Sequence, residues 1–408
     1  MILIFNFIIP AVPPPVNADA AAESCDNRPK ALGVPMKLIY ICRHLTLLGG
    51  QSRIAWELAE RALKENNEVH FVARRFPADI KNHKISTHRI FQWPNFFGEA
   101  ARFRTFASLS SREAARLAGA GSVIHGFGDS YRQDILTLGN VDWNYAQLIP
   151  GRVPSETAVH VKTKSFKDPS LRFLVLVSDH QRKEVLNLIP DFDPSKIRVI
   201  FPGVDAQRFA LHSRESIRAR LHREQGIPLD SKWLVFAAGG DFEKRNIATL
   251  NKALLRLRHR PDWRMIFIGG RKDQIPWPKE LEGRGHFLGR LGDIGTVLPG
   301  CDLMVYPAWY EEFGLVCLEA MASGLPLAVC RTVGCSELVS PTHKEAGVLK
   351  DPADAAQLAQ IIETLLTNDP LRHRLSDENR KIAQEYSWDH MFRKYKTLYE
   401  EVAATRRE

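Results

Sequence analysis

Short apolar runs alternate with amphipathic segments along almost the whole chain after residue 36. Apolar runs of about 4–8 residues are typical of buried strands, and apolar residues at every third or fourth position are typical of helices. Strands that alternate with helices predict a parallel sheet covered on both faces. In the first half we expect strands at 37–42, 68–73, 85–91, 122–127, 171–177 and 196–201, with helices at 51–64, 99–117 and 179–188.

The alternation restarts after the Pro202-Gly203 turn. Two such series predict an α/β protein with two doubly wound, Rossmann-like domains at 36–204 and 205–385. A terminal segment, 386–408, is expected to be a helix that packs back toward the first domain, and ligands are expected beyond the carboxyl ends of the strands in a cleft shared by both domains. The second series has strands at 233–237, 263–268, 302–306 and 326–329, a short element at 286–288, and helices at 246–257, 294–298, 313–323 and 353–367.

The first residues do not continue this pattern. Met1–Val12 is apolar, but it is shorter than the roughly 20 residues that span a bilayer, and neither Lys nor Arg precedes it. Residues 13–35 are rich in Pro and Ala. We expect residues 1–35 to be a disordered extension, or to precede a true start at Met36, with a membrane anchor as the alternative.

Composition narrows the class of protein. A chain of 408 residues is too long for one ordinary core. The net charge of +9 fits an acidic partner, but no nucleic-acid signature accompanies it, so we expect no nucleic-acid binding. Cys42, Cys317 and Cys330 lie in apolar runs, and the chain contains no C-x-x-C pair. Cysteine used as a core residue predicts a reduced, cytoplasmic protein.

The most informative stretch is an acidic loop followed by a short helix. An apolar run ends at Pro307, Glu311 follows, and a helix near Phe313 carries Glu319 before Gly324 ends it. The free N–H groups at a helix N-terminus bind anions. Two carboxylates beside an anion site suit a ligand with phosphates and hydroxyls, which describes a sugar nucleotide. The alternative is that the glutamates only complement the helix dipole or face solvent.

Two further turns have the chemistry of a phosphate site. Gly49-Gly50 lies between the first strand and the first helix, where glycines let a phosphate or sugar approach the backbone. Lys244-Arg245 stands at the start of a helix, against the helix dipole, and a bound diphosphate would compensate that charge. A tight turn and a solvated basic turn are the respective alternatives.

The remaining candidates are a histidine and a basic loop. His125 ends the fourth predicted strand, and it is either a group that positions a proton or a sugar hydroxyl, or a core histidine with satisfied partners. The loop 140–170 carries several basic residues. They face either anionic lipid headgroups at the inner leaflet of a membrane or an anionic acceptor, or they are solvated. These basic residues are Arg152, His160, Lys162, Lys164 and Lys167.

At this point the motifs resemble a known family. Glu311-x7-Glu319, within Glu-Glu-Phe-Gly-Leu-Val-Cys-Leu-Glu-Ala-Met-Ala-Ser-Gly-Leu-Pro, resembles the signature of family 4 retaining glycosyltransferases. The resemblance extends over residues 37 to about 400. A narrower likeness, to lipopolysaccharide core glucosyltransferases, rests on 177–179 and 240–242. The other agreeing segments are Gly49-Gly50, Phe201-Pro202-Gly203-Val204-Asp205, Phe209, Lys244-Arg245, Phe267-Ile268-Gly269-Gly270 and Trp388.

The resemblance implies a GT-B fold whose C-terminal domain holds the nucleotide sugar while the N-terminal domain meets the acceptor. It implies that Glu319 binds the ribose hydroxyls and that Glu311 binds the donor sugar. His125 matches a histidine that some members place near the anomeric carbon. By the same resemblance, the N–H groups near Phe313, Gly314 and Leu315 hold sugar and phosphate oxygens, and Lys244 and Arg245 neutralise the leaving diphosphate with Gly49 and Gly50 closing on it.

The implied activity is metal-independent, retaining transfer of a hexose, with UDP-glucose as the favoured donor and no cofactor. A lipid-linked saccharide such as the lipopolysaccharide core is the implied acceptor, which suggests a peripheral position at the inner membrane. A nucleotide-sugar epimerase, a phosphorylase and a non-catalytic nucleotide-sugar binding protein are the alternatives. The sequence departs from the family pattern at Lys244-Arg245-Asn246, where Arg, Lys and often Gly are usual, and in a shorter loop at 140–170.

Overall fold

The computed structural model describes residues 34–46, 49–77, 80, 83–91, 98–139, 148–149, 151–210 and 212–407. The predicted extension at 1–35 lies outside these ranges except for Val34 and Pro35, and so does the part of the basic loop at 140–147. Everything that follows concerns the described residues from Pro35 onward.

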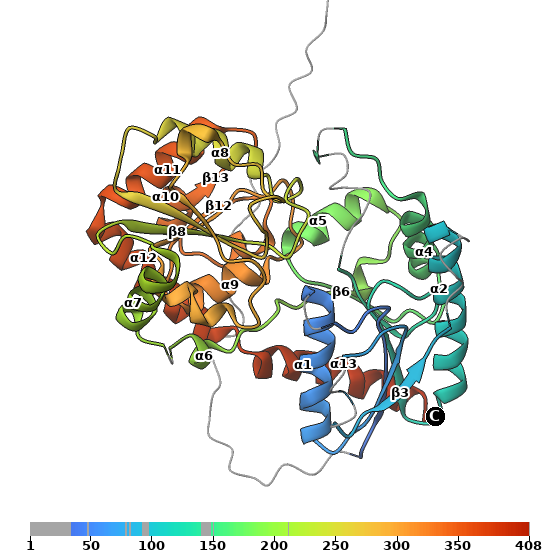
Figure 1. The fold of residues 1–408 in the computed structure, drawn as a ribbon. Helices are drawn as coiled ribbons and strands as arrows, with labels where there is room; N and C mark the ends of the chain where they lie inside the picture. The colour runs from blue at the N-terminus through green and yellow to red at the C-terminus, as the bar shows by residue number, and fades with distance from the viewer. Residues whose placement is uncertain are drawn as a thin grey trace, which may run out of the picture. The chain divides into compact units, whose positions relative to one another are not determined.

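The first half of the chain builds a parallel sheet, as its apolar runs predict (Figure 1). The described strands follow the order β3-β2-β1-β4-β5-β6-β7. Strand β5 was not predicted. The bounds are β1 Lys37–Ile41, β2 Glu68–Ala73, β3 Ser86–Arg89, β4 Ser122–Gly126, β5 Ile135–Thr137, β6 Phe173–Leu176 and β7 Ile197–Val199.

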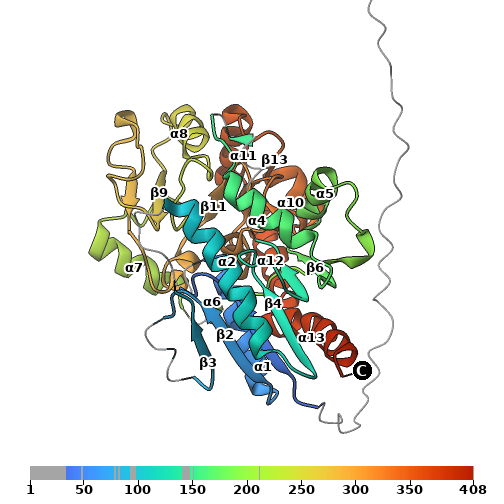
Figure 2. The ribbon, with the colours of Figure 1, turned by 90° about the vertical axis from the view of Figure 1, so that its right-hand side faces the viewer.

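Four helices pack on this sheet: α1 Gly50–Lys64, α2 Gly98–Leu117, α4 Glu156–Phe166 and α5 Asp179–Leu188. Helix α4 corrects the prediction of a continuous loop at 140–170. It lies beside α2 (Figure 2), and Ser155 caps it by accepting the Ala158 N–H. Its buried face includes Thr157, Lys162 and Ser165, and these polar residues hide the apolar periodicity in the sequence.

The second half builds another parallel sheet, with the described strands in the order β10-β9-β8-β11-β12-β13. The chain enters at β8, adds β9 and β10 on one side, and then continues with β11 on the other side. Such a reversal of strand order is the place where ligands bind in doubly wound sheets. The bounds are β8 Lys232–Ala237, β9 Trp263–Ile268, β10 Gly285–Phe287, β11 Leu303–Tyr306, β12 Leu327–Cys330 and β13 Val348–Leu349.

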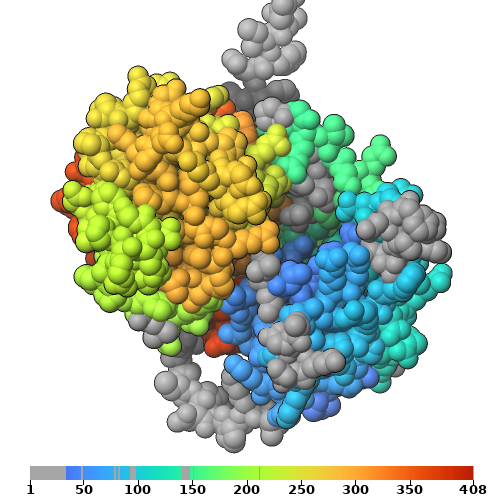
Figure 3. Space-filling model, in the orientation of Figure 1, coloured from blue at the N-terminus to red at the C-terminus, as the bar shows by residue number. Residues whose placement is uncertain are grey.

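Helices α7 and α12 of the second half were not predicted. Helix α7 buries only Ile217 and Leu221 among its twelve residues, and it packs on the short turn at Leu298–Gly300. In Figure 3 the yellow-green surface that includes α7 adjoins the orange surface of later residues of the same half. The predicted helix at 294–298 is instead a pair of 3₁₀ turns. The helices are α6 Ala206–Ala210, α7 Arg214–Gln225, α8 Ile247–Arg256, α9 Leu315–Ala322, α10 Pro341–Gly347, α11 Ala355–Thr367, α12 Asp369–Glu385 and α13 Trp388–Thr405.

The last helix, α13, returns to the first sheet, which confirms the predicted crossing. It packs against α1 and β4 (Figure 1). Its Tyr395 hydroxyl lies 2.9 Å from the Thr137 hydroxyl. The chain passes between the two sheets at Val204, whose N–H donates to the Tyr386 carbonyl oxygen at 2.8 Å. The segment between the sheets is therefore bonded to the start of α13.

Candidate active site

Four charged residues meet where the strand order of the second sheet reverses. Lys244 and Arg245 follow β8, while Glu311 and Glu312 follow β11, the strand paired with β8. Because the carboxyl ends of neighbouring parallel strands share one edge, residues far apart in sequence become neighbours. The Trp309 N–H donates to the Lys244 carbonyl oxygen at 3.0 Å and joins the two loops directly.

The charges form two ion pairs of different exposure. Lys244 Nζ lies 3.2 Å from Glu312 Oε2, and these side chains are 4% and 7% exposed. Arg245 Nη2 lies 3.0 Å from Glu311 Oε2, and these side chains are 21% and 15% exposed. Both Arg245 Nε and Glu311 also contact the Tyr306 hydroxyl at 3.2 Å. A ligand at this edge of the sheet therefore reaches Arg245 and Glu311 more readily than Lys244.

Glu312 is a site residue whose role we did not predict. Burial raises the pKa of its carboxyl, and Lys244 opposes that rise. Removing one member of such a buried pair leaves an uncompensated charge, which costs several kcal/mol. The predicted role of Lys244 toward a diphosphate stays a prediction, and in this structure the Lys244 ammonium is paired with Glu312. The sequence could have indicated this pairing, because two adjacent acidic residues follow one predicted strand and two adjacent cationic residues follow another.

Helix α9 begins beside this acidic loop. Gly314 is its N-cap, with a φ of 86° that favours glycine, and a Cβ there would stand 3.0 Å from Val333 Cγ1. The helix starts at Leu315, two residues later than the prediction. Phe313 is buried and its carbonyl oxygen accepts the Cys335 N–H at 2.7 Å. The first N–H groups of α9 have no partner within the helix, as at every helix N-terminus, and are suited to an anion.

Glu319 lies one turn into α9 and differs from the other two glutamates. Its side chain is half-buried and, among the described residues, has no hydrogen bond or ion pair. Burial raises the pKa of its carboxyl to about 7, with Arg53 and Arg208 opposing the rise. A carboxylate without a partner, at the edge of the sheet where ligands bind, is suited to accept hydrogen bonds from hydroxyl groups.

The predicted glycine turn lies close to α9. A Cβ on Gly50 would stand 3.5 Å from Leu315 Cδ1, and Gly49 is the N-cap of α1. Arg53, one turn into α1, acts electrostatically on Glu319. The structure therefore brings the Gly49-Gly50 turn, Leu315 and Glu319 to one place, although they come from both halves of the chain.

The pKa of Glu319 predicts a pH-dependent affinity for a nucleotide sugar. A carboxylate accepts hydroxyl hydrogen bonds better when ionised, so binding favours the deprotonated form. With a pKa of about 7 in the free protein, we expect the Kd for UDP-glucose to fall about tenfold as the pH rises from about 6 to about 8. Calorimetric titration across this range measures the effect, because the diester diphosphate of UDP-glucose does not itself titrate there.

The Glu319→Gln variant is the control, since an amide cannot titrate. Its Kd should stay flat over the same pH range and should be weaker than that of the wild type at the alkaline end. An equally steep pH dependence in both proteins would assign the titration to another group.

Several contacts connect the first half of the chain to this site. Ser178 Oγ donates to the Glu312 carbonyl oxygen at 2.7 Å. Glu337 accepts the N–H groups of Asp179 and His180 at the start of α5, where a helix dipole favours an anion. Arg152 makes a two-fold contact with Asp241, at 3.0 and 2.9 Å. Arg152, a candidate for lipid headgroups, is thus paired with the loop after β8.

His125 lies apart from these residues. It is 1% exposed, and its two ring nitrogens contact the Tyr399 hydroxyl at 2.9 Å and the Thr137 hydroxyl at 2.7 Å. Burial lowers the pKa of the imidazole to about 3, which keeps the ring neutral. Of the two interpretations left open by the sequence, this geometry fits the core histidine, because the side chain faces α13.

Replacement of His125 separates those interpretations. We expect His125→Ala to lower the free energy of unfolding by about 3 kcal/mol, because a cavity forms and two buried hydroxyls lose a partner. Urea denaturation measures this change. The specific activity of the folded fraction should stay within about threefold of the wild type; a loss of kcat at unchanged stability would instead return His125 to the reacting centre.

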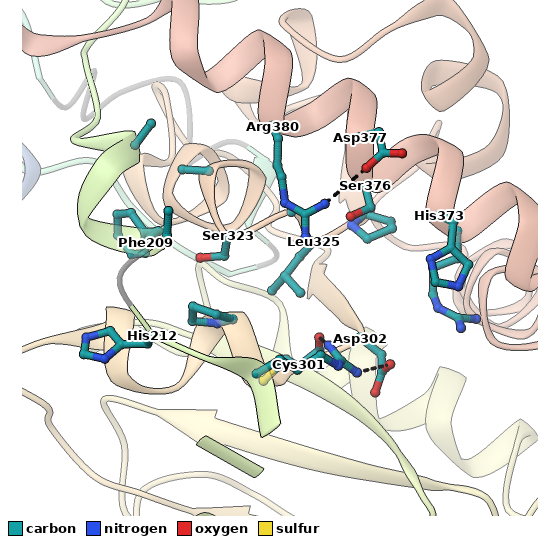
Figure 4. A pocket seen from close by; sticks show the side chains of 18 of the residues that line it. Phe209, His212, Cys301, Asp302, Ser323, Leu325, His373, Ser376, Asp377 and Arg380 are labelled. Carbon is teal, nitrogen blue, oxygen red and sulfur yellow. Dashed lines mark hydrogen bonds and ion pairs between the residues drawn. The ribbon is translucent and has the colours of Figure 1, made fainter. Parts of the chain in front are cut away.

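A cavity of about 660 Å³ lies elsewhere in the second half. It is lined by the first residues of strands, such as Lys232, and by α12, which contributes His373, Ser376, Asp377 and Arg380 (Figure 4). None of the predicted site residues lines it. The amino ends of the strands face this cavity, so it is at the opposite edge of the sheet from the ion pairs.

Other predictions concern the rest of the described chain. Cys42, Cys317 and Cys330 are buried and free, which confirms their use as core residues. No described helix combines the length and the apolar character needed to cross a bilayer. Among the described residues, no group of three or more His, Cys, Asp or Glu is arranged to hold a metal ion. Metal-independence remains a prediction.

Solved structures of the same architecture decide the fold. WaaG, a glycosyltransferase involved in lipopolysaccharide biosynthesis, superposes with a TM-score of 0.72 at 17% identity, over 89% of this chain and 99% of that one. The sucrose-phosphate synthase of Thermosynechococcus elongatus gives 0.74 at 20%, over 91% and 100%. This chain has the GT-B fold. Anabaena HepE in complex with UDP and glucose, with a TM-score of 0.69 at 19% identity over 90% and 100%, shares it.

Sequence comparison gives a result consistent with this fold for the second half of the chain. Residues 218–382, which include both ion pairs and Glu319, match the family described as Glycosyl transferases group 1. The D-inositol 3-phosphate glycosyltransferase of Nocardioides sp. is 29% identical over 257 residues, 58% of this chain and 55% of that protein. The N-acetyl-alpha-D-glucosaminyl L-malate synthase of Bacillus anthracis is 23% identical over 389 residues, 87% and 94%.

The relatives do not favour the narrower likeness to lipopolysaccharide core enzymes. The chain spans about half the length of the D-inositol 3-phosphate glycosyltransferases that it matches. The WaaG superposition, at 17% identity, concerns the fold. The substrates of this chain therefore have to be argued from its own residues.

Proposed function

We propose that this protein is a glycosyltransferase that moves a hexose from a nucleoside-diphosphate sugar to a hydroxyl of an acceptor. The observation that carries the proposal is the joining of Arg245, Glu311 and the N-terminus of α9 at the reversal of strand order, with Glu319 unpartnered one turn further on. A diphosphate and two sets of hydroxyls need this combination of cation, helix N–H groups and carboxylates. The group 1 match over 218–382 supports it.

The residues have separate roles in the proposed reaction. Arg245 and the first N–H groups of α9 bind the diphosphate, Glu311 accepts hydroxyls of the donor sugar, and Glu319 accepts those of the ribose. The bond between the anomeric carbon and the diphosphate oxygen breaks, and its electron pair stays on that oxygen. The acceptor oxygen bonds to the anomeric carbon while its proton passes to the departing diphosphate. Cations and helix dipoles placed in advance stabilise the charge that builds there.

The finer assignment is UDP-glucose as donor, with retention of configuration and no metal. Because a protein with the same fold was solved in complex with UDP and glucose, UDP-glucose is the first donor to test. The acceptor proposed from sequence is a lipid-linked saccharide. A small anionic acceptor is the second candidate, because curated relatives are named for D-inositol 3-phosphate and L-malate. Peripheral membrane attachment belongs to the first candidate only.

A ligand screen followed by a turnover assay tests the proposal. In thermal-shift measurements with UDP-, GDP- and ADP-glucose, one of the three donors should stabilise the protein. We expect that donor to be UDP-glucose. Slow hydrolysis of that donor, followed by proton NMR, should release α-glucose first if configuration is retained. Release of free nucleotide with an epimerised sugar would favour an epimerase, and binding without any turnover would favour a binding protein. Absence of stabilisation by all three donors would refute the proposal.

A further inference from the structure

Two arginines lie side by side just beyond the carboxyl ends of β1 and β2. Ile41 pairs with Val72 in the parallel register, so position 43 pairs with position 74 two residues later. The Arg74 N–H donates to the Arg43 carbonyl oxygen at 3.1 Å, which keeps this pairing beyond the strands. Ile41 and Val72 both pack in the cluster with Phe106 of α2. Because side chains alternate along a strand, Arg43 and Arg74 emerge on that same face.

Like charges at opposed positions on one face of a sheet are destabilising, and no described carboxylate forms an ion pair with either arginine. Arg43 Nε is buried and has no hydrogen-bond partner among the described residues. Arg102 of α2 adds a third cation. Burial, Arg75, Arg43 and Arg102 together lower the pKa of Arg74.

Two acidic residues, Asp129 and Glu99, lie near this cluster. Asp129 Oδ2 accepts the backbone N–H of Arg43 at 3.1 Å, and Glu99 acts on His44, whose pKa is lowered to about 4 by burial and by Arg43, Arg74 and Arg75. The Arg43 guanidinium carbon lies 4.9 Å from the centre of the Phe103 ring, which holds the guanidinium in place. The Arg43 guanidinium is therefore held in place although Arg43 and Arg74 repel each other.

One member of this cluster, Arg43, lies on the same loop as the Gly49-Gly50 turn, between β1 and α1. Strands β1 and β4 are the pair at which the order of the first sheet reverses, and Gln51 Nε2 donates to the Phe127 carbonyl oxygen after β4 at 2.9 Å. The cluster therefore belongs to the ligand edge of the first sheet.

We propose that Arg43 and Arg74, with Arg102 beside them, bind a phosphate group of the acceptor. The inference rests on the proposed function, since it assigns the acceptor of the same reaction. Planar guanidinium groups bind phosphate oxygens through paired hydrogen bonds, and a bound dianion removes their mutual repulsion. A neutral acceptor would leave Arg43 and Arg74 without a compensating carboxylate among the described residues. The phosphate belongs either to a soluble acceptor or to a lipid-linked one.

Inorganic phosphate is the probe for the subsite. It is titrated calorimetrically into the full-length chain, with saturating UDP in one series and without UDP in another. We expect Arg43→Ala/Arg74→Ala to weaken phosphate binding about tenfold or more. Arg198→Ala is the matched control, because Arg198 also stacks on a ring of this sheet, 4.9 Å from the centre of Phe173. Its phosphate affinity should equal that of the wild type.

Stability gives an independent readout. Because the arginines repel each other, Arg74→Ala should keep or raise the Tm in phosphate-free buffer, and phosphate should raise the Tm of the wild type only. A lower Tm for Arg74→Ala without phosphate would show that the arginine is required by the fold and would overturn the subsite.

Vesicle sedimentation distinguishes the source of the phosphate. A lipid-linked acceptor is supported if the wild type binds phosphatidylglycerol vesicles but not phosphatidylcholine vesicles, and the double variant binds neither. Phosphate binding that is lost in the double variant without any vesicle binding supports a soluble one. Equal behaviour of wild type and double variant in both arms overturns the inference. If the protein binds phosphate through these arginines but does not bind UDP, the result refutes the proposed donor chemistry and still supports the anion subsite.

Discussion

Replacing Arg245 by alanine is expected to lower kcat/KM for sugar transfer about a thousandfold, or about 4 kcal/mol of transition-state stabilisation. Arg245 is the partly exposed cation at the strand reversal, and the leaving diphosphate gains negative charge as the glycosidic bond breaks. The variant also leaves Glu311 without its cationic partner, which adds repulsion toward the diphosphate. Steady-state kinetics with UDP-glucose and the identified acceptor measure the loss.

Three further variants separate these causes. Arg245→Lys keeps the charge but not the two-fold geometry and should recover part of the rate. The double variant Arg245→Ala/Glu311→Gln removes the stranded carboxylate, so any recovery over the single variant reports that repulsion. Arg271→Ala, whose partner Asp273 is equally exposed, is the surface control and should leave kcat/KM unchanged. Wild-type kinetics in Arg245→Ala would rule out the site.

Gly203→Ala is expected to lower the stability of the protein strongly. A Cβ at position 203 would stand 2.3 Å from the Trp388 backbone nitrogen and 2.5 Å from the Ser387 carbonyl carbon. Backbone atoms cannot move aside as a flexible side chain does, so the start of α13 has to shift away from the segment between the sheets. We expect the free energy of unfolding to fall by about 3 kcal/mol or more. Urea denaturation followed by tryptophan fluorescence measures it.

Gly292→Ala is the matched control, because a Cβ there meets no atom within 4 Å. Its stability should stay within about 0.5 kcal/mol of the wild type. If Gly203→Ala unfolds at the same urea concentration as this control, the close contact with α13 is not required by the fold.

Strongly apolar elements could be predicted from the sequence, and weakly patterned ones could not. Strands β2 and β9 have the predicted bounds. Helix α12 escaped prediction because it buries only Arg372, Leu375, Asn379 and Ala383, and two of these are polar. Periodicity identifies an element by its apolar face, so an element whose buried positions are polar gives no such signal.

The candidate site divides in the same way. The acidic loop, the helix that follows it and the glycine turn were recognisable because their residue types stand at the ends of predicted strands. The pairing of Lys244 with Glu312 and of Arg245 with Glu311 was not, since it depends on how two loops 68 residues apart meet at one sheet edge. His125 shows the converse: its place at a strand end suggested chemistry, whereas the hydroxyls of Tyr399 in α13 and Thr137 in β5 satisfy its two ring nitrogens.

The sequence alone determined the alternation of strands and helices, and with it two parallel sheets whose carboxyl ends carry the polar residues. The reason is local, because burial periodicity and turn residues act over a few positions. Only the tertiary structure decided which of those polar residues are accessible to a ligand and which are paired inside the protein. Burial and charge pairing are set by neighbours distant in sequence, so Arg43 and Arg74, unremarkable as letters, become an uncompensated pair only when β1 and β2 lie in register.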